Sequence, residues 1–184
     1  MPDYRRWYVP GGTFFFTLVT EHRRAILATD LARRCLREAI DEVRGKRPFD
    51  LLAVALLPDH LHAIWTLPLG DGDYPMRWKQ IKEQFTRRYL RAGGQEVPIS
   101  ASRRRHQECG IWQRRYWEHS VRDEEDLKRC VDYIHWNPKK HGHVASVREW
   151  RWSSFHRFVA LGEYSLDWGA EDPTPGYEDP EWGE

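Results

Sequence analysis

Two apolar segments on either side of a short turn constrain the fold of this chain most strongly. FDLLAVALL (49–57) is an almost continuous apolar run, Pro58-Asp59 forms a turn signal, and HLHAIWTL (60–67) is the second run. Apolar runs of this length, bounded by turn residues, are typical of buried strands. The sequence therefore predicts a strand that turns and is followed at once by a return strand.

The segments around this pair predict the rest of an α+β fold. TFFFTLVT (13–20) is expected to be a strand, and an amphipathic helix follows it, with Asp30 as N-cap and Gly45 and Pro48 at its end. A second helix is predicted at about 75–92, then a loop rich in Gly and Arg (93–110) and a strand within 111–121. The order βαββαβ is that of a ferredoxin-like split βαβ sheet.

One more helix is predicted over 122–138. Its acidic first turn suits the positive end of the helix dipole, and Leu127, Cys130, Val131 and Ile134 form its apolar stripe. Tyr133 and Asn137 lie four residues apart, so they share a shoulder beside that stripe that can face a cleft. Because Asn137 precedes a proline, it is expected to be the last helical residue or the cap.

The charge is distributed unevenly along the chain. Residues 163–184 contain eight acidic and no basic side chains, which leaves 29 basic against 20 acidic side chains in residues 1–162. We expect one basic domain over 1–162, able to attract a polyanion, and a largely disordered acidic tail over 163–184. No signal peptide or membrane span is evident, and the three cysteines are odd in number, so a cytoplasmic protein without disulfides is expected.

His60 and His62 flank one leucine inside the second apolar run. Side chains alternate along a strand, so both imidazoles would lie on one face with Ile64, close enough to converge on one ion. The alternative to metal binding is that the pair occurs by chance, because nine histidines produce such spacings easily and the chain has another pair at His141 and His143. The histidine pair by itself therefore leaves metal binding open.

Four segments, taken in order, resemble the REP-associated tyrosine transposases, of the IS200-like transposase family and the HUH endonuclease superfamily with a single catalytic tyrosine. They are MPDYRRWYVPGGTFFFTLVT, LLPDHLHAIW, WQRRYWEHSVRDEEDLKRCVDYIHWNPKKHGHV and WRWSSFHRFV. The resemblance implies that His60 and His62 are metal ligands, that Asn137 is a third ligand, and that Tyr133 is the nucleophile. It further implies a hairpin of single-stranded DNA as substrate and a covalent link between the tyrosine and the 5′ phosphate.

The chemistry of these residues is consistent with that implication. Imidazoles with an amide oxygen suit Mg²⁺ or Mn²⁺, which would act as a Lewis acid on a scissile phosphate. A phosphotyrosine keeps the energy of the phosphodiester, so a free 3′ hydroxyl can reverse the step and rejoin strands. The enzyme is thus expected to cleave and rejoin DNA and to associate with the nucleoid.

Arginines, lysines and tryptophans outside this site are the expected DNA contacts, because such mixtures bind phosphates and stack unpaired bases. They are Arg5, Arg6, Trp7, Arg103, Arg104, Arg105, Trp112, Arg114, Arg115, Lys139 and Lys140. The acidic tail could fold over this basic surface and compete with DNA.

Three questions stay open at this point. The arginine cluster could be a solvated face without a ligand. The protein could bind hairpin DNA without cutting it, or it could be an unrelated metal-dependent hydrolase that uses water as nucleophile. The sequence also leaves the oligomeric state open, with a monomer favoured.

Overall fold

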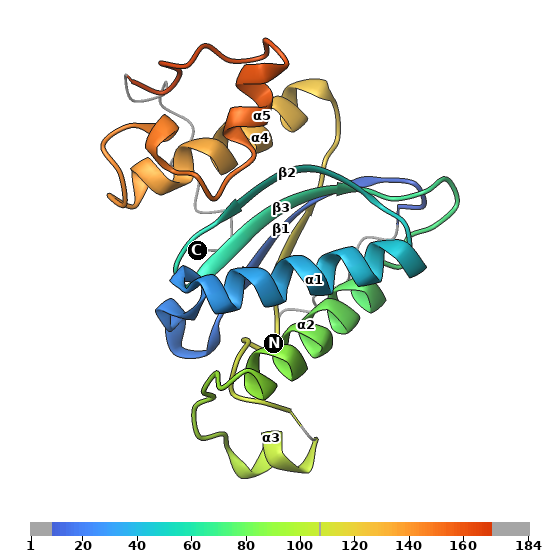
Figure 1. Cartoon of the computed structure of the whole chain (residues 1–184). Coiled ribbons are helices and arrows are strands. Elements are labelled where there is room, and N and C mark those ends of the chain that lie inside the picture. The colour runs from blue at the N-terminus through green and yellow to red at the C-terminus, as the bar shows by residue number, and fades with distance from the viewer. Residues whose placement is uncertain (1–8, 107, 171–184) are drawn as a thin grey trace.

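The computed structural model describes residues 9–106 and 108–170. Within them the chain forms a four-stranded antiparallel sheet with helices on both faces (Figure 1). The strands are β1 (Thr13–Val19), β2 (Asp50–Leu56), β3 (His60–Thr66) and β4 (Trp117–Ser120). The α-helices are α1 (Asp30–Lys46), α2 (Tyr74–Arg91), α3 (Ala101–Arg105), α4 (Glu124–Lys140) and α5 (Phe155–Ala160). Short 3₁₀ helices occupy Glu21–Arg23, Ala25–Ala28 and Val147–Glu149. The α+β class expected from the sequence is confirmed.

The order across the sheet is β2-β3-β1-β4, and every neighbouring pair is antiparallel. β1 and β2 therefore run in the same direction on either side of β3, and α1 connects them. The register places Thr17 of β1 opposite His62 and Val19 opposite His60. β3 thus lies inside the sheet, with a hydrogen-bonded neighbour on each side.

Alternate residues of β3 contribute to two separate cores. Leu61, Ala63 and Trp65 belong to the larger core, which also contains the buried faces of α1 and α2. Ile64 belongs to a smaller core between the sheet and α4. Figure 1 shows α1 and α2 on one face of the sheet and α4 and α5 on the other. The two imidazoles therefore lie on the α4 side, because His60 and His62 alternate with the residues of the larger core.

Several local details differ from the sequence-based expectations. Thr29, not Asp30, is the N-cap of α1, because the Thr29 hydroxyl accepts a hydrogen bond from the Ala32 amide. The loop expected at 93–110 contains α3, which is capped by the Ser100 side chain. The strand expected within 111–121 is limited to β4, while Trp112 forms only an isolated bridge with Thr20.

The prediction that α4 ends at Asn137 is wrong. The helix continues to Lys140, and the amide of His141 donates to the Asn137 carbonyl, which closes the last turn. A proline in a helix removes one hydrogen bond to the carbonyl four residues earlier, but it lies here only one turn from the end, where few bonds remain to be lost. The consequence is that Asn137 has helical geometry and is fully buried.

The chain after α5 remains packed through residue 170, within the segment expected to be a tail. The Tyr164 ring stacks on Phe155 and Trp168, and the Tyr164 hydroxyl donates to Asp132 of α4. Residues 171–184 lie outside the described residues, so the competition between the acidic end and DNA stays a prediction. Among the described helices, none combines the length and the apolar character that crossing a lipid bilayer requires.

Candidate active site on the central strand

The two histidines of β3 are almost completely buried, with exposures of 2% for His60 and 0% for His62. Their ring centroids lie 4.9 Å apart. The Nδ1 atom of His62 lies 2.9 Å from the Thr17 hydroxyl, and Nδ1 of His60 lies 2.6 Å from Oδ1 of Asp59. Each ring is therefore oriented by a neighbour that bonds to Nδ1.

The Asp59 contact has a direct consequence for His60. Burial alone raises the pKa of Asp59, but hydrogen bonds from His60 and Arg23 outweigh it and lower that pKa to about 2. The ionised carboxylate can only accept, so Nδ1 of His60 carries the proton and Nε2 of a neutral ring has its lone pair available. Nε2 of His60 is buried and has no hydrogen-bond partner among the described residues. A buried nitrogen of this kind suits a metal ligand, and the hydrogen bond that Nδ1 donates to Asp59 fixes the orientation of the ring.

Helix α4 brings the tyrosine to the same place. Tyr133 is fully buried, and its ring centroid lies 5.4 Å from that of His62 and 6.0 Å from that of Phe15. Asn137 lies one turn further along α4 and is also fully buried. The structure therefore brings the predicted nucleophile and both histidines together.

Two neighbours of this site were not assigned to it from the sequence. The Lys140 ammonium group donates to the Tyr133 hydroxyl over 3.3 Å and lies 4.9 Å from the centroid of its ring. His141, the C-cap of α4, places its ring 5.4 Å from that of His60. Both follow Asn137 on the same helix end, and the extension of α4 past Pro138 is what positions them.

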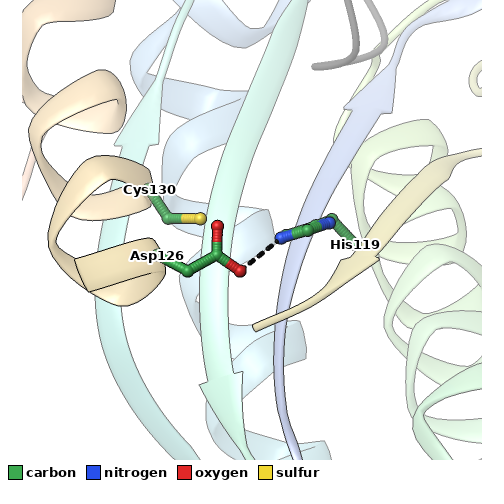
Figure 2. A group of neighbouring side chains, drawn as sticks. All are labelled: His119, Asp126 and Cys130. Atoms are coloured by element: carbon green, nitrogen blue, oxygen red, sulfur yellow. Dashed lines mark hydrogen bonds and ion pairs between the residues drawn. The ribbon is translucent and has the colours of Figure 1, made fainter. Parts of the chain in front are cut away.

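A second cluster, formed by His119, Asp126 and Cys130, links β4 to the start of α4 (Figure 2). Burial alone raises the pKa of Asp126, but hydrogen bonds from Arg122 and His119 hold it below its usual range. Burial also raises the pKa of the Cys130 thiol, which disfavours the thiolate that a metal requires. Because arginines and an imidazole already neutralise Asp126, we interpret the cluster as an anchor for α4.

The expected DNA contacts differ in whether their side chains are available to a ligand. Arg104, Arg105 and Arg115 are exposed and available to a ligand. Arg103 binds Glu21 and Glu108 and donates to the backbone carbonyls of Cys109 and Trp112, so its guanidinium group is already paired and its contact with DNA stays a prediction. Trp112 is only 4% exposed, and its ring packs edge-on against Phe85 in the larger core. The prediction that Trp112 stacks a base is therefore wrong for this conformation, because its ring is already enclosed.

The remaining expected contacts also differ from one another. Arg114 is exposed but pairs with Glu108 over 2.9 Å. Lys139 donates to the backbone carbonyls of Gly169 and Ala170 and holds the C-terminal segment. Lys140 lies at Tyr133, as described above. Arg5, Arg6 and Trp7 lie outside the described residues.

The site thus combines a buried histidine pair on a central strand with a buried tyrosine on a covering helix, and its class is that of a DNA-processing enzyme. Comparisons with known proteins agree. The family model described as transposase IS200 like matches residues 10–137. A REP-associated tyrosine transposase of Escherichia coli (strain K12) is 44% identical over 174 residues, 93% of each protein. A putative REP-associated tyrosine transposase of Haemophilus influenzae is 41% identical over 169 residues, 92% of this chain and 94% of that protein.

A solved structure shows the same similarity in three dimensions. It is the structure of a REP-associated tyrosine transposase bound to a REP hairpin, 40% identical, with a TM-score of 0.80 over 100% of this chain and 98% of the other. The chain belongs to the IS200-like transposase family and resembles its REP-associated tyrosine transposases.

Proposed function

We propose that this chain cleaves and rejoins single-stranded DNA beside a hairpin, with Tyr133 as the nucleophile. The observation that carries the proposal is the position of the Tyr133 ring, enclosed on the sheet face that holds both histidines and in contact with the Lys140 ammonium group. A tyrosine with only a packing role would not need a cation at its hydroxyl. The hairpin substrate is proposed from the similar structure, which was solved with a REP hairpin.

The residues present fit a divalent cation. Nε2 of His60 is a buried nitrogen without a hydrogen-bond partner among the described residues, and Asp59 holds the opposite ring nitrogen. We propose that His60, His62 and Asn137 would hold Mg²⁺ or Mn²⁺, because the amide oxygen suits these ions and three protein ligands leave positions open for phosphate oxygens and water. When bound, the ion would draw negative charge from the scissile phosphate.

The residues of the chain carry out the bond changes. The Tyr133 hydroxyl loses its proton as its oxygen attacks the phosphorus, and the bond from phosphorus to the 3′ oxygen breaks. The leaving oxygen takes up a proton and becomes a hydroxyl, so one proton is released and one is taken up. The product is a 5′-phosphotyrosine link and a free 3′ hydroxyl. Lys140 places a positive charge at the Tyr133 oxygen, which favours the negative charge that this oxygen carries once its proton has left. In the reverse step a 3′ hydroxyl attacks the same phosphorus and releases Tyr133.

A labelled hairpin with a single-stranded flank tests the proposal. Wild-type protein with Mn²⁺ should give a protein–DNA adduct that survives denaturation, and Tyr133→Phe should give none. Tyr89→Phe is the matched control, because Tyr89 is a buried tyrosine of the opposite core. Tight hairpin binding without an adduct from the wild type would favour a binding protein. Cleavage that persists in Tyr133→Phe without protein-linked DNA would favour a water-dependent hydrolase.

A further inference from the structure

A cavity of about 630 Å³ lies at the edge of the sheet, between α1 and the segment that follows the 3₁₀ helix Val147–Glu149. This segment pairs with the free edge of β2: the Leu56 amide donates to the Trp152 carbonyl, and the Ser154 amide donates to the Val54 carbonyl. The cavity is therefore bounded by the α1 face of the sheet, whereas the candidate active site occupies the α4 face. The mechanism proposed above uses none of its residues.

The wall of this cavity is strongly basic. Five arginines line it, together with Trp152: Arg33, Arg34, Arg37, Arg44 and Arg151. The acidic residues of the lining are Asp30 and Asp41, which leaves an excess of three positive charges. Arg34 and Arg37 are exposed and form no ion pair or hydrogen bond with the described residues. By contrast, Arg88, between α1 and α2, is neutralised by both Glu38 and Glu42.

Two arginines lie against the same tryptophan. The guanidinium carbon of Arg33 lies 3.7 Å from the Trp152 ring centroid, and that of Arg151 lies 4.5 Å from it. Nε of Arg33 is buried without a hydrogen-bond partner among the described residues. Burial lowers the pKa of Arg33, the Asp30 carboxylate 3.6 Å away raises it in part, and the charge of Arg151 lowers it again. An anion in the cavity would relieve this repulsion between like charges.

The floor of the cavity is apolar. Ile40, Leu51 and Val54 are only partly buried and open onto the cavity beneath the arginines. A basic rim over an apolar floor, with an indole at one side, fits a nucleotide unit. Arginines hold the phosphates of such a unit, Trp152 keeps two of them in place, and the apolar floor receives the base.

We infer that this cavity is a second DNA site, which binds a nucleotide of the single-stranded segment flanking the hairpin. The inference rests on the proposed function in so far as DNA is the ligand. β2 lies directly beside β3, and the segment 152–154 pairs with its other edge, so a DNA strand that leaves the active-site face would cross this segment to reach the arginines. The second site would lengthen the stretch of DNA that is held during cleavage and rejoining.

Arg34→Glu and Arg37→Glu, made singly and together, test the inference. Arg91→Glu is the control, because Arg91 is an exposed arginine of α2 that does not line this cavity. All these side chains are exposed, so the folding stability of each variant should change little. Binding is measured by fluorescence anisotropy, at two salt concentrations, on a hairpin with a flank of about 15 nucleotides and on the same hairpin without it.

We expect each pocket variant to weaken binding of the flanked hairpin about tenfold and to lower the slope of log affinity against log salt by about one. Each Arg34 or Arg37 variant should bind the hairpin without a flank as tightly as the Arg91→Glu control does. Equal affinity of the pocket variants and the control for flanked DNA would overturn the inference, and so would equal weakening on both DNAs. Failure of the proposed function would be seen separately, as the absence of a Tyr133 adduct from the wild type.

Discussion

The face of the sheet covered by α1 and α2 differs from the face covered by α4 in what it buries. On the first face the Trp65 ring stacks on Phe49 and Trp78, each with centroids 4.0 Å apart. On the second face the same strand buries two imidazoles, and α4 buries Tyr133 and Asn137 against them. On the first face β1 and β3 thus contribute only apolar side chains, while the second face places polar groups where an apolar core would be more stable.

The stability of the fold therefore resides mainly in the core on the α1–α2 face. Polar side chains buried on the α4 face need partners such as Thr17 for His62, and Asp59 for His60. Each such pair contributes less than the apolar contacts that it replaces. We therefore expect substitutions on the α1–α2 face to lower stability, and substitutions on the α4 face to lower activity first.

His62→Ala should have the largest effect. Loss of a ligand and of the ring beside Tyr133 is expected to slow adduct formation on the order of 10⁴-fold, about 5 kcal/mol in the barrier. Calorimetry should also show that the variant no longer binds Mn²⁺, which is a readout independent of cleavage. Retention of wild-type Mn²⁺ affinity would remove His62 from the proposed ligand set.

Leu61→Ala changes the neighbouring residue, whose side chain points to the opposite face and is 1% exposed. The cavity left in the larger core should lower the free energy of unfolding by about 3 kcal/mol, as measured by urea denaturation. Mn²⁺ affinity should stay unchanged while the variant is folded. If Leu61→Ala lost metal binding and His62→Ala lost stability instead, the assignment of stability to the α1–α2 face and of activity to the α4 face would be refuted.

Asp126→Asn tests a polar anchor on the α4 face. Removing the charge leaves His119 and Arg122 without their partner, and we expect about 2 kcal/mol of destabilisation, because the arginines are exposed and screened. The pKa of Asp126 is lowered in the fold, so its contribution is present above the ordinary value of 3.8 and is lost as the pH falls below it. Urea denaturation between pH 3 and pH 7 should therefore show a smaller loss of stability in acid for the variant than for the wild type.

Much of the difference between the two faces of the sheet could be predicted from the alternation of residues in β3. HLHAIW assigns His60 and His62 to one face and Leu61 and Trp65 to the other, and the structure confirms it. The period-2 pattern suffices there, because each side chain in a strand has only two directions available.

The same reasoning fails where direction depends on distant segments. Trp112 stands among arginines in the sequence, and only the packing of α2 shows that its ring is enclosed by Phe85. The sequence indicates only a turn at Asp59, and it could not predict the contact with His60 because that contact depends on the rotamers of both side chains. Local composition identified the basic segments but could not separate cations that are already paired from those available to DNA.

Lys140→Gln has the smallest expected effect and decides between two interpretations of this lysine. From composition Lys140 was expected to contact DNA, whereas its position 3.3 Å from the Tyr133 hydroxyl indicates a role in the attack. If it acts on Tyr133, the rate of adduct formation at saturating DNA should fall about tenfold, with unchanged DNA affinity and with partial recovery in Lys140→Arg. If it only binds a phosphate, the affinity should fall and the rate at saturation should remain that of the wild type. The first outcome would show that the α4 face uses the cation at its helix end for chemistry.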